Sequence, residues 1–177
     1  MEKIPLLKGS YRDILKNKDG HVIYDGGWVS NMIVATCRKL LAGFMIRDPS
    51  SGIEYLAVGR GDESWDAEGA PDAPDPTMEM PDLKHKFTPP IFFQDLTVFY
   101  IDEYGTESVG PEKQLQITAT LGPGYPTPEA PLSTYPLREF GLFGTFDGEP
   151  YMINYKSHPV IHKHESATLI REIRLYF

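Results

Sequence analysis

Hydrophobic and polar side chains alternate along the last ten residues, 168–177. The positions on one side are Leu169, Arg171, Ile173, Leu175 and Phe177. An alternation of period two is the pattern of a β-strand with one better-buried face. From Leu137 onward the chain is also rich in strand-forming residues, and turn residues interrupt it at 145–148. We therefore expect three consecutive antiparallel strands from Leu137 to Phe177, at the centre of a sheet.

A second region with strand character lies near the start. Two short runs, Tyr11–Leu15 and His21–Tyr24, flank the sequence Asn17-Lys18-Asp19-Gly20. Because Asp-Gly readily adopts the positive backbone angles that a tight turn needs, this pattern predicts a β-hairpin.

The spacing of apolar residues changes to three and four after Trp28. The residues that follow this spacing are Ile33, Cys37, Leu40, Leu41 and Phe44. They predict an amphipathic helix over residues 29–45, capped by Ser30 or Asn31. Cys37, the single cysteine, belongs to the apolar stripe, and we expect it to be a small core residue rather than a nucleophile.

Three further strands are predicted in the middle of the chain. They cover 53–58, a well-buried run at 91–101, and 115–121, where apolar and polar residues alternate. A chain of 177 residues with 16 Gly and 16 Pro is typical of one turn-rich domain. We expect residues 1–177 to form a single α+β domain: an antiparallel β-sandwich-like sheet with one packed amphipathic helix and two long Pro-rich loops.

The negative charge is concentrated in one segment. Eight acidic residues and no Lys or Arg lie between Asp62 and Asp82, and the remaining 17 acids (25 minus 8) balance the 17 bases. Residues 62–90 therefore read as an acidic Pro-rich insertion arm on a neutral body. Nucleic acid is not an expected partner, since no basic stripe is present. No apolar run approaches the ~18 residues of a membrane span, so we expect no membrane insertion.

Long loops in a compact domain are usually functional. The insertion carries Trp65, Met78 and Met80, and a second Pro-rich connection, 122–136, carries Tyr125. Aromatic and methionine side chains are enriched in the cores of protein interfaces. These four residues are the candidate interface residues.

The sequence offers weak candidates for catalysis or metal binding. His158, His162 and His164 form the one histidine cluster, but only Glu165 accompanies them as a further ligand type, so a polar edge or turn is favoured over a zinc site. The Gly59-Arg60-Gly61 turn lacks the rest of a phosphate-binding loop. We expect no catalytic residue, cofactor or metal, and we expect Glu139 and Arg171 to form a cross-strand ion pair.

Three motifs resemble tail-fibre attachment and baseplate-associated structural proteins of tailed phages and phage-tail-like contractile particles. Trp28-Val-Ser-Asn-Met-Ile-Val34 with Leu40-Leu-Ala42 is similar to the N-terminal helix of that group. Tyr55-Leu-Ala-Val-Gly-Arg-Gly-Asp62 is similar to its strand and turn, and Leu137-Arg-Glu-Phe-Gly-Leu-Phe143 to a later strand. The motifs follow in the same order and span residues 28–177 with gaps.

The resemblance implies a structural role without catalysis. We expect a structural or adaptor subunit of a phage tail, baseplate or neck, or of a tail-derived contractile particle, assembled in a bacterial host cytoplasm. Its partners would be other tail, baseplate or neck proteins and copies of itself. Two alternatives remain: a glycan-binding β-sandwich module for host-surface recognition, and a small metal-dependent hydrolase built on the histidine cluster.

Overall fold

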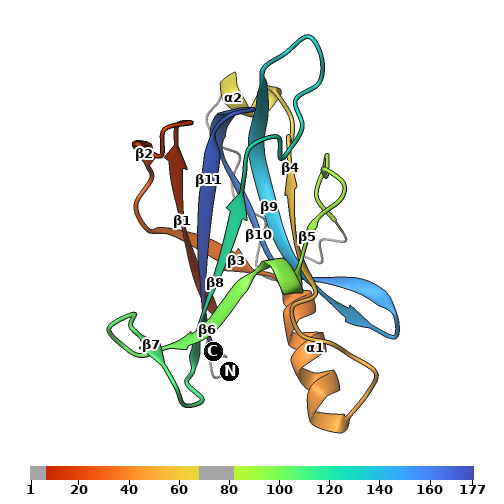
Figure 1. Cartoon of the computed structure of the whole chain (residues 1–177). Helices are drawn as coiled ribbons and strands as arrows, with labels where there is room; N and C mark the ends of the chain where they lie inside the picture. The colour runs from red at the N-terminus through yellow and green to blue at the C-terminus, as the bar shows by residue number, and fades with distance from the viewer. Residues whose placement is uncertain (1–6, 68–81) are drawn as a thin grey trace.

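Antiparallel β-sheet dominates the computed structural model, which describes residues 7–67 and 82–177 (Figure 1). The strands are β1 (Lys8–Lys16), β2 (Val22–Asp25), β3 (Val29–Ile33), β4 (Tyr55–Gly59), β5 (Ile91–Phe92), β6 (Thr97–Ile101), β7 (Glu107–Ser108), β8 (Gln114–Leu121), β9 (Thr134–Phe146), β10 (Glu149–His164) and β11 (Thr168–Tyr176). The helices are α1 (Ala35–Ile46), the short α2 (Ser64–Ala67) and the 3-10 turn η1 (Phe93–Asp95). This is a β-rich α+β fold with one main helix.

The strands join in the order β5-β4-β9-β10-β3-β1-β11-β8-β6-β7, with β2 paired to β1 outside this path. The central pairs are long: β1 pairs with β11 from Lys8↔Tyr176 to Lys16↔Thr168. In β11, and in β8 from Ile117 onward, the residues that alternate in the sequence also alternate in burial, because one face of each strand meets the core. The strands predicted at 115–121 and 168–177 are confirmed.

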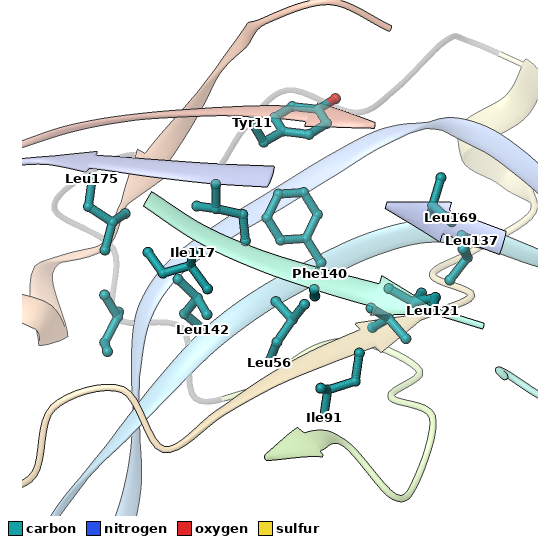
Figure 2. Close-up of a cluster of buried hydrophobic side chains, with 14 of the residues drawn as sticks. Tyr11, Leu56, Ile91, Ile117, Leu121, Leu137, Phe140, Leu142, Leu169 and Leu175 are labelled. Atoms are coloured by element: carbon teal, nitrogen blue, oxygen red, sulfur yellow. The ribbon is translucent and has the colours of Figure 1, made fainter. Parts of the chain in front are cut away.

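Side chains from well-separated strands meet in one hydrophobic core (Figure 2). Tyr11 of β1 packs edge-on against Phe140 of β9, with ring centroids 5.1 Å apart, although these strands are not hydrogen-bonded neighbours. The core also includes Leu56, Ile117 and Leu169, from β4, β8 and β11. Burial of each such side chain stabilises the fold by ~1.5–3 kcal/mol, so this cluster holds the two ends of the sheet together.

The C-terminal third agrees only partly with the prediction. β9 and β10 form the expected hairpin around Asp147 and Gly148, both with positive φ. β10 and β11 are not neighbours, however, because β3 and β1 lie between them. The apolar pattern of β11 shows which face is buried but not which strand lies beside it, and β1 supplies a full-length partner.

The predicted helix begins too early. Residues 29–33 form β3, which pairs with β1 from Lys8↔Met32 to Tyr11↔Val29, and α1 starts only at Ala35. The predicted caps, Ser30 and Asn31, therefore lie in a strand, since sheet pairing outweighs the local helical spacing. Cys37 and Leu40 are buried as expected, and α1 ends at Arg47 in a left-handed conformation.

The β-hairpin near the start is confirmed as β1 and β2. The single buried strand predicted at 91–101 is wrong. The chain there pairs first with β4 as β5, turns through η1, and then pairs with β8 as β6. Phe92 and Phe93 are exposed because this segment passes from one end of the sheet order toward the other.

Candidate functional site

Two of the three motifs in the sequence lie side by side in the fold. β4 and β9 pair from Tyr55↔Phe143 to Gly59↔Glu139, so the Gly59-Arg60-Gly61 turn meets Arg138 and Glu139. The two segments are far apart in the sequence but form one structural unit.

Arg138 fixes the turn and the short helix α2. Its guanidinium donates two hydrogen bonds to the Asp66 carboxylate, at 2.8 and 2.7 Å, and a third to the carbonyl of Arg60 at 2.9 Å. The hydrogen bonds from Arg138 lower the pKa of Asp66. Because Arg138 is almost fully buried, this planar, bidentate contact positions α2 against β9.

Glu139 is fully buried and accepts hydrogen bonds on both carboxylate oxygens. The donors are the backbone N–H groups of Lys84 (3.0 Å) and His85 (2.8 Å) and the hydroxyl of Tyr155 (3.1 Å). Burial, and next the neighbouring Glu139 carboxylate, raise the pKa of Tyr155. The predicted Glu139–Arg171 ion pair is wrong, because Glu139 holds the segment that precedes β5, and Arg171 has another partner.

The glycines of the turn allow close approach of other groups. A Cβ on Gly59 would lie 2.6 Å from the carbonyl oxygen of His85, and a Cβ on Gly61 would lie 2.3 Å from the Trp65 ring. Gly61 also has a φ of +56°. Gly59 therefore favours glycine for packing, and Gly61 favours it for both packing and backbone conformation.

A polar pocket of about 390 Å³ opens beside this unit. It is lined by Arg60, Gly61, Asp62, Glu63, His85, Glu129, Leu132, Thr134, Tyr135, Pro136 and Arg138. Arg60 donates to Glu129 across the pocket at 3.0 Å, and His85 Nδ1 lies 2.6 Å from the carbonyl oxygen of Gly61. Since both guanidiniums face carboxylates, the pocket suits a small uncharged polar molecule better than an anion.

The structure places two of the four candidate interface residues. Trp65 is half-buried on α2, with Lys84 Nζ 5.9 Å from its ring. Tyr125 is half-buried and donates to the carbonyl of Pro89 at 2.8 Å, and its ring packs edge-on against Phe87. Met78 and Met80 lie outside the described residues. Tyr125 thus contributes to the packing of its own domain, whereas Trp65 supports the Gly61 turn.

The three candidate histidines are not brought together. His158 is buried among charged groups, whereas His164 is exposed, and its Nδ1 lies 2.9 Å from the Ser166 hydroxyl. Within residues 7–67 and 82–177, no group of three or more His, Cys, Asp or Glu side chains is arranged to hold a metal ion.

A buried charged cluster was missed by the sequence analysis. Arg171 donates to both Asp13 oxygens, at 2.8 and 2.7 Å, and lies 3.0 Å from His158 Nε2. The Arg171 guanidinium also stacks over the Phe140 ring at 4.2 Å. Burial, followed by the charge of Arg171, lowers the pKa of His158 to about 4. A signal was present, since Arg171 occupies an apolar-face position of its strand.

An apolar groove of about 280 Å³ lies between part of α1 and the sheet. Its lining is Cys37, Leu40, Leu41, Phe44, Gly52, Ile53, Phe93, Val98, Leu115, Ile153, Leu175 and Phe177. Four of these side chains form an exposed rim: Leu41 is 37% exposed, Phe44 45%, Phe93 48% and Phe177 46%. A surface of this kind accepts apolar groups.

No protein-family model, curated protein or solved structure matches this chain. In the described part of the chain no helix is long and apolar enough to cross a membrane.

Proposed function

We propose that this chain is a structural or adaptor subunit of a phage tail, baseplate or neck, or of a tail-derived contractile particle. It acts by docking neighbouring subunits and by self-association. Its partners are other proteins of the particle and further copies of the chain.

The apolar groove is the observation that carries this proposal. Its rim leaves four large apolar side chains partly exposed around a hollow that is itself lined by apolar groups. Exposed apolar surface costs ~25 cal/mol per Å² relative to burial, and contiguous patches of a few hundred Å² usually mark interaction sites. A subunit that assembles with neighbours covers such a surface.

The paired motifs give further support. The segments that resemble phage structural proteins pair as β4 and β9, and Arg138 and Glu139 use their hydrogen bonds to fasten α2 and the segment before β5. These side chains act as supports for loops. We further infer that the sheet works as a sandwich-like scaffold, on which α1 and the two Pro-rich connections present contact surfaces.

The test is recovery of the chain in particles. The full chain carrying a tag is expressed in the source cells, and tail-like particles are purified by sedimentation and analysed by mass spectrometry. We expect the wild-type chain in the particles and at least a tenfold loss for Phe44→Glu, which places a charge on the groove rim. The matched control is Tyr104→Glu, at an exposed side chain outside the groove.

Two results would count against the proposal. One is absence of the wild-type chain from purified particles. The other is equal recovery of Phe44→Glu and wild type, which would show that the groove is not a contact surface in the particle. Circular dichroism of both variants establishes that they are folded.

The polar pocket favours glycan binding as a second candidate function. It has about 390 Å³ of space, and its lining combines the Tyr135 hydroxyl with His85 and the carboxylates of Glu63 and Glu129. These groups donate to and accept from the hydroxyls of a neutral sugar. A glycan array with purified protein tests it: binding that is lost in Glu129→Gln supports the candidate, and an empty array rejects it.

A further inference from the structure

We propose that the apolar groove binds strand β2 of a second copy, so that copies assemble head to tail. This inference rests on the proposed structural function and names the partner of the groove. It requires two different apolar surfaces on one molecule.

The second surface lies around β2. We define the β2 patch as Val22, Ile23, Tyr24, Trp28 and Val29. Their exposed fractions are 56%, 59%, 48%, 38% and 41%, respectively. Every residue of β2 is exposed although three of its four side chains are apolar, which is unusual for a strand at the edge of a sheet.

The geometry of β2 presents its side chains outward. β2 pairs with β1 alone among the described strands, so its other edge carries no neighbouring strand there. The register shifts between Leu15↔Tyr24 and Lys16↔Val22, which leaves Ile23 as the extra residue of a β-bulge. Trp28 is fixed beneath the guanidinium of Arg174, 4.1 Å from its ring. The patch is therefore held in place and needs little reordering to bind.

Strand β2 lies away from α1, the helix that forms one wall of the groove. Figure 1 shows β2 at the upper left and α1 at the lower right. The patch of one molecule cannot reach its own groove, but it can reach the groove of a neighbour. A contact between two different surfaces of identical subunits is heterologous, and its repetition produces a ring or a filament.

The sizes of the two surfaces match a stable interface. With ~200 Å² for a fully exposed large apolar side chain, the groove rim and the β2 patch each offer roughly 400 Å². Together they give roughly 800 Å² of apolar area, and interfaces are about 56–65% apolar, so the complete contact reaches about 1,300 Å². Pairing two grooves with each other would leave the β2 patch in water, whereas the heterologous contact covers both surfaces.

The volumes also agree. A groove of about 280 Å³ accommodates two aliphatic side chains, and Val22 and Ile23 are the most exposed members of the β2 patch. The groove lining contains no charged side chain, so a glutamate at the bulge position would be buried without a partner.

Sedimentation equilibrium with three single variants tests the proposal. Leu41→Glu blocks the groove, Ile23→Glu blocks the β2 patch, and Val109→Glu is a fully exposed control outside both surfaces. We expect wild type and V109E to form concentration-dependent species larger than a dimer. We expect L41E and I23E each to be monomeric, with self-association at least tenfold weaker.

The decisive measurement is the equimolar mixture of L41E and I23E. L41E retains an intact β2 patch and I23E retains an intact groove, so the mixture has one working contact and must stop at a dimer of the two variants. Groove-to-groove pairing predicts instead that I23E self-associates like wild type and that L41E and I23E form no mixed dimer. Circular dichroism establishes that each variant is folded.

Failure of this inference is distinguishable from failure of the proposed function. A wild-type chain that stays monomeric at ~100 µM overturns head-to-tail assembly, and so does an I23E protein that assembles normally. If that same chain is still recovered in purified particles, the proposed function stands with a different partner in the groove. If the mixture forms the dimer but the chain is absent from particles, the contact is real and the particle role is wrong.

Discussion

Arg171 of β11 and Asp13 of β1 form a buried bidentate ion pair, with N–O distances of 2.8 and 2.7 Å. The two residues come from opposite ends of the chain, and both side chains are almost fully withdrawn from water. Tyr11, Phe140 and His158 surround the pair. A charge pair in this setting is strongly dependent on both members being present, because either charge alone would be buried without compensation.

Removal of one member of this pair should strongly lower the stability of the folded chain. Asp13→Ala leaves the Arg171 charge inside the core, and we expect a loss of about 3–5 kcal/mol in the free energy of unfolding. Urea denaturation measures it. Asp25→Ala is the matched control, because Asp25 pairs with Arg12 at the surface, where water screens the charges and the pair contributes little to stability. Equal losses in the two variants would contradict the burial argument.

The stability should depend on pH through His158. Burial lowers its pKa from 6.5 to about 4 in the folded state, so between these values the unfolded chain binds a proton that the folded chain does not. Stability therefore falls as the pH is lowered from 6.5 to 4, by an amount on the order of 3 kcal/mol for this group. The groups that face the imidazole ring are Asp13, Arg171, Lys156 and Tyr11. A substitution of His158 alone leaves all four of them unchanged.

Thermal melts of wild type and His158→Gln across this pH range check the assignment. The glutamine has no proton to gain, so its stability should vary less between pH 6.5 and 4 even if it is lower at neutral pH. The hydrogen bonds from Arg138 also lower the pKa of Asp66, and that contribution is lost only at lower pH, below the ordinary carboxyl range. Parallel pH curves for wild type and variant would contradict the assignment to His158.

Glu139 should be sensitive to an isosteric change. Glu139→Gln replaces an acceptor oxygen by an NH₂ group, so at least one of the three donors, Lys84 N–H, His85 N–H or Tyr155 O–H, loses its acceptor in a buried position. We expect a loss of about 1–3 kcal/mol, visible as a lower melting temperature. Glu149→Gln, at an exposed position, should leave the melting temperature within error.

Gly61 and Gly20 separate the effect of conformation from that of packing. Both have positive φ, +56° and +82°, but a Cβ on Gly61 would collide with Trp65, whereas a Cβ on Gly20 meets nothing within 4 Å. Gly20→Ala should cost about 1 kcal/mol, the penalty for the left-handed backbone, and Gly61→Ala distinctly more. Urea denaturation measures the free energy of unfolding of the two variants. Equal losses would show that the Trp65 side chain moves aside without an energetic penalty.

Local patterns in the sequence predicted the strands in which one face is buried along most of the length. The alternation at Leu115–Leu121 and Leu169–Leu175 identified two strands, because one face of each meets the core. Residues 29–33 and 91–101 were misassigned because their structure depends on distant partners: β3 on β1 and β10, and β5 and β6 on β4 and β8. Periodicity reports exposure and carries no information about such partners.

The candidate surfaces were harder to predict than the strands. The groove is lined by residues of α1, β6, β8, β10, β11 and the segments between them. No single stretch of the sequence therefore contains a pattern that predicts it. The hydroxyl and ring of Tyr125 contact Pro89 and Phe87 of the same chain. The interface role stays a prediction for Tyr125 and Trp65, as it does for Met78 and Met80, which lie outside the described residues. The alternating pattern did place Arg171, a buried charge, on the apolar face of its strand.

The pairing of β1 with β11 also sets an order of events during synthesis. Lys8–Lys16 leave the ribosome long before Thr168–Tyr176, the strand they pair with along its full length. Until then β1 has only β2 and β3 as neighbours, Asp13 has no counter-charge, and the core facing Phe140 is open. Contacts between such distant segments slow folding. We therefore expect nascent chains truncated before Thr168 to remain protease-sensitive, and protection to appear in one step once β11 emerges.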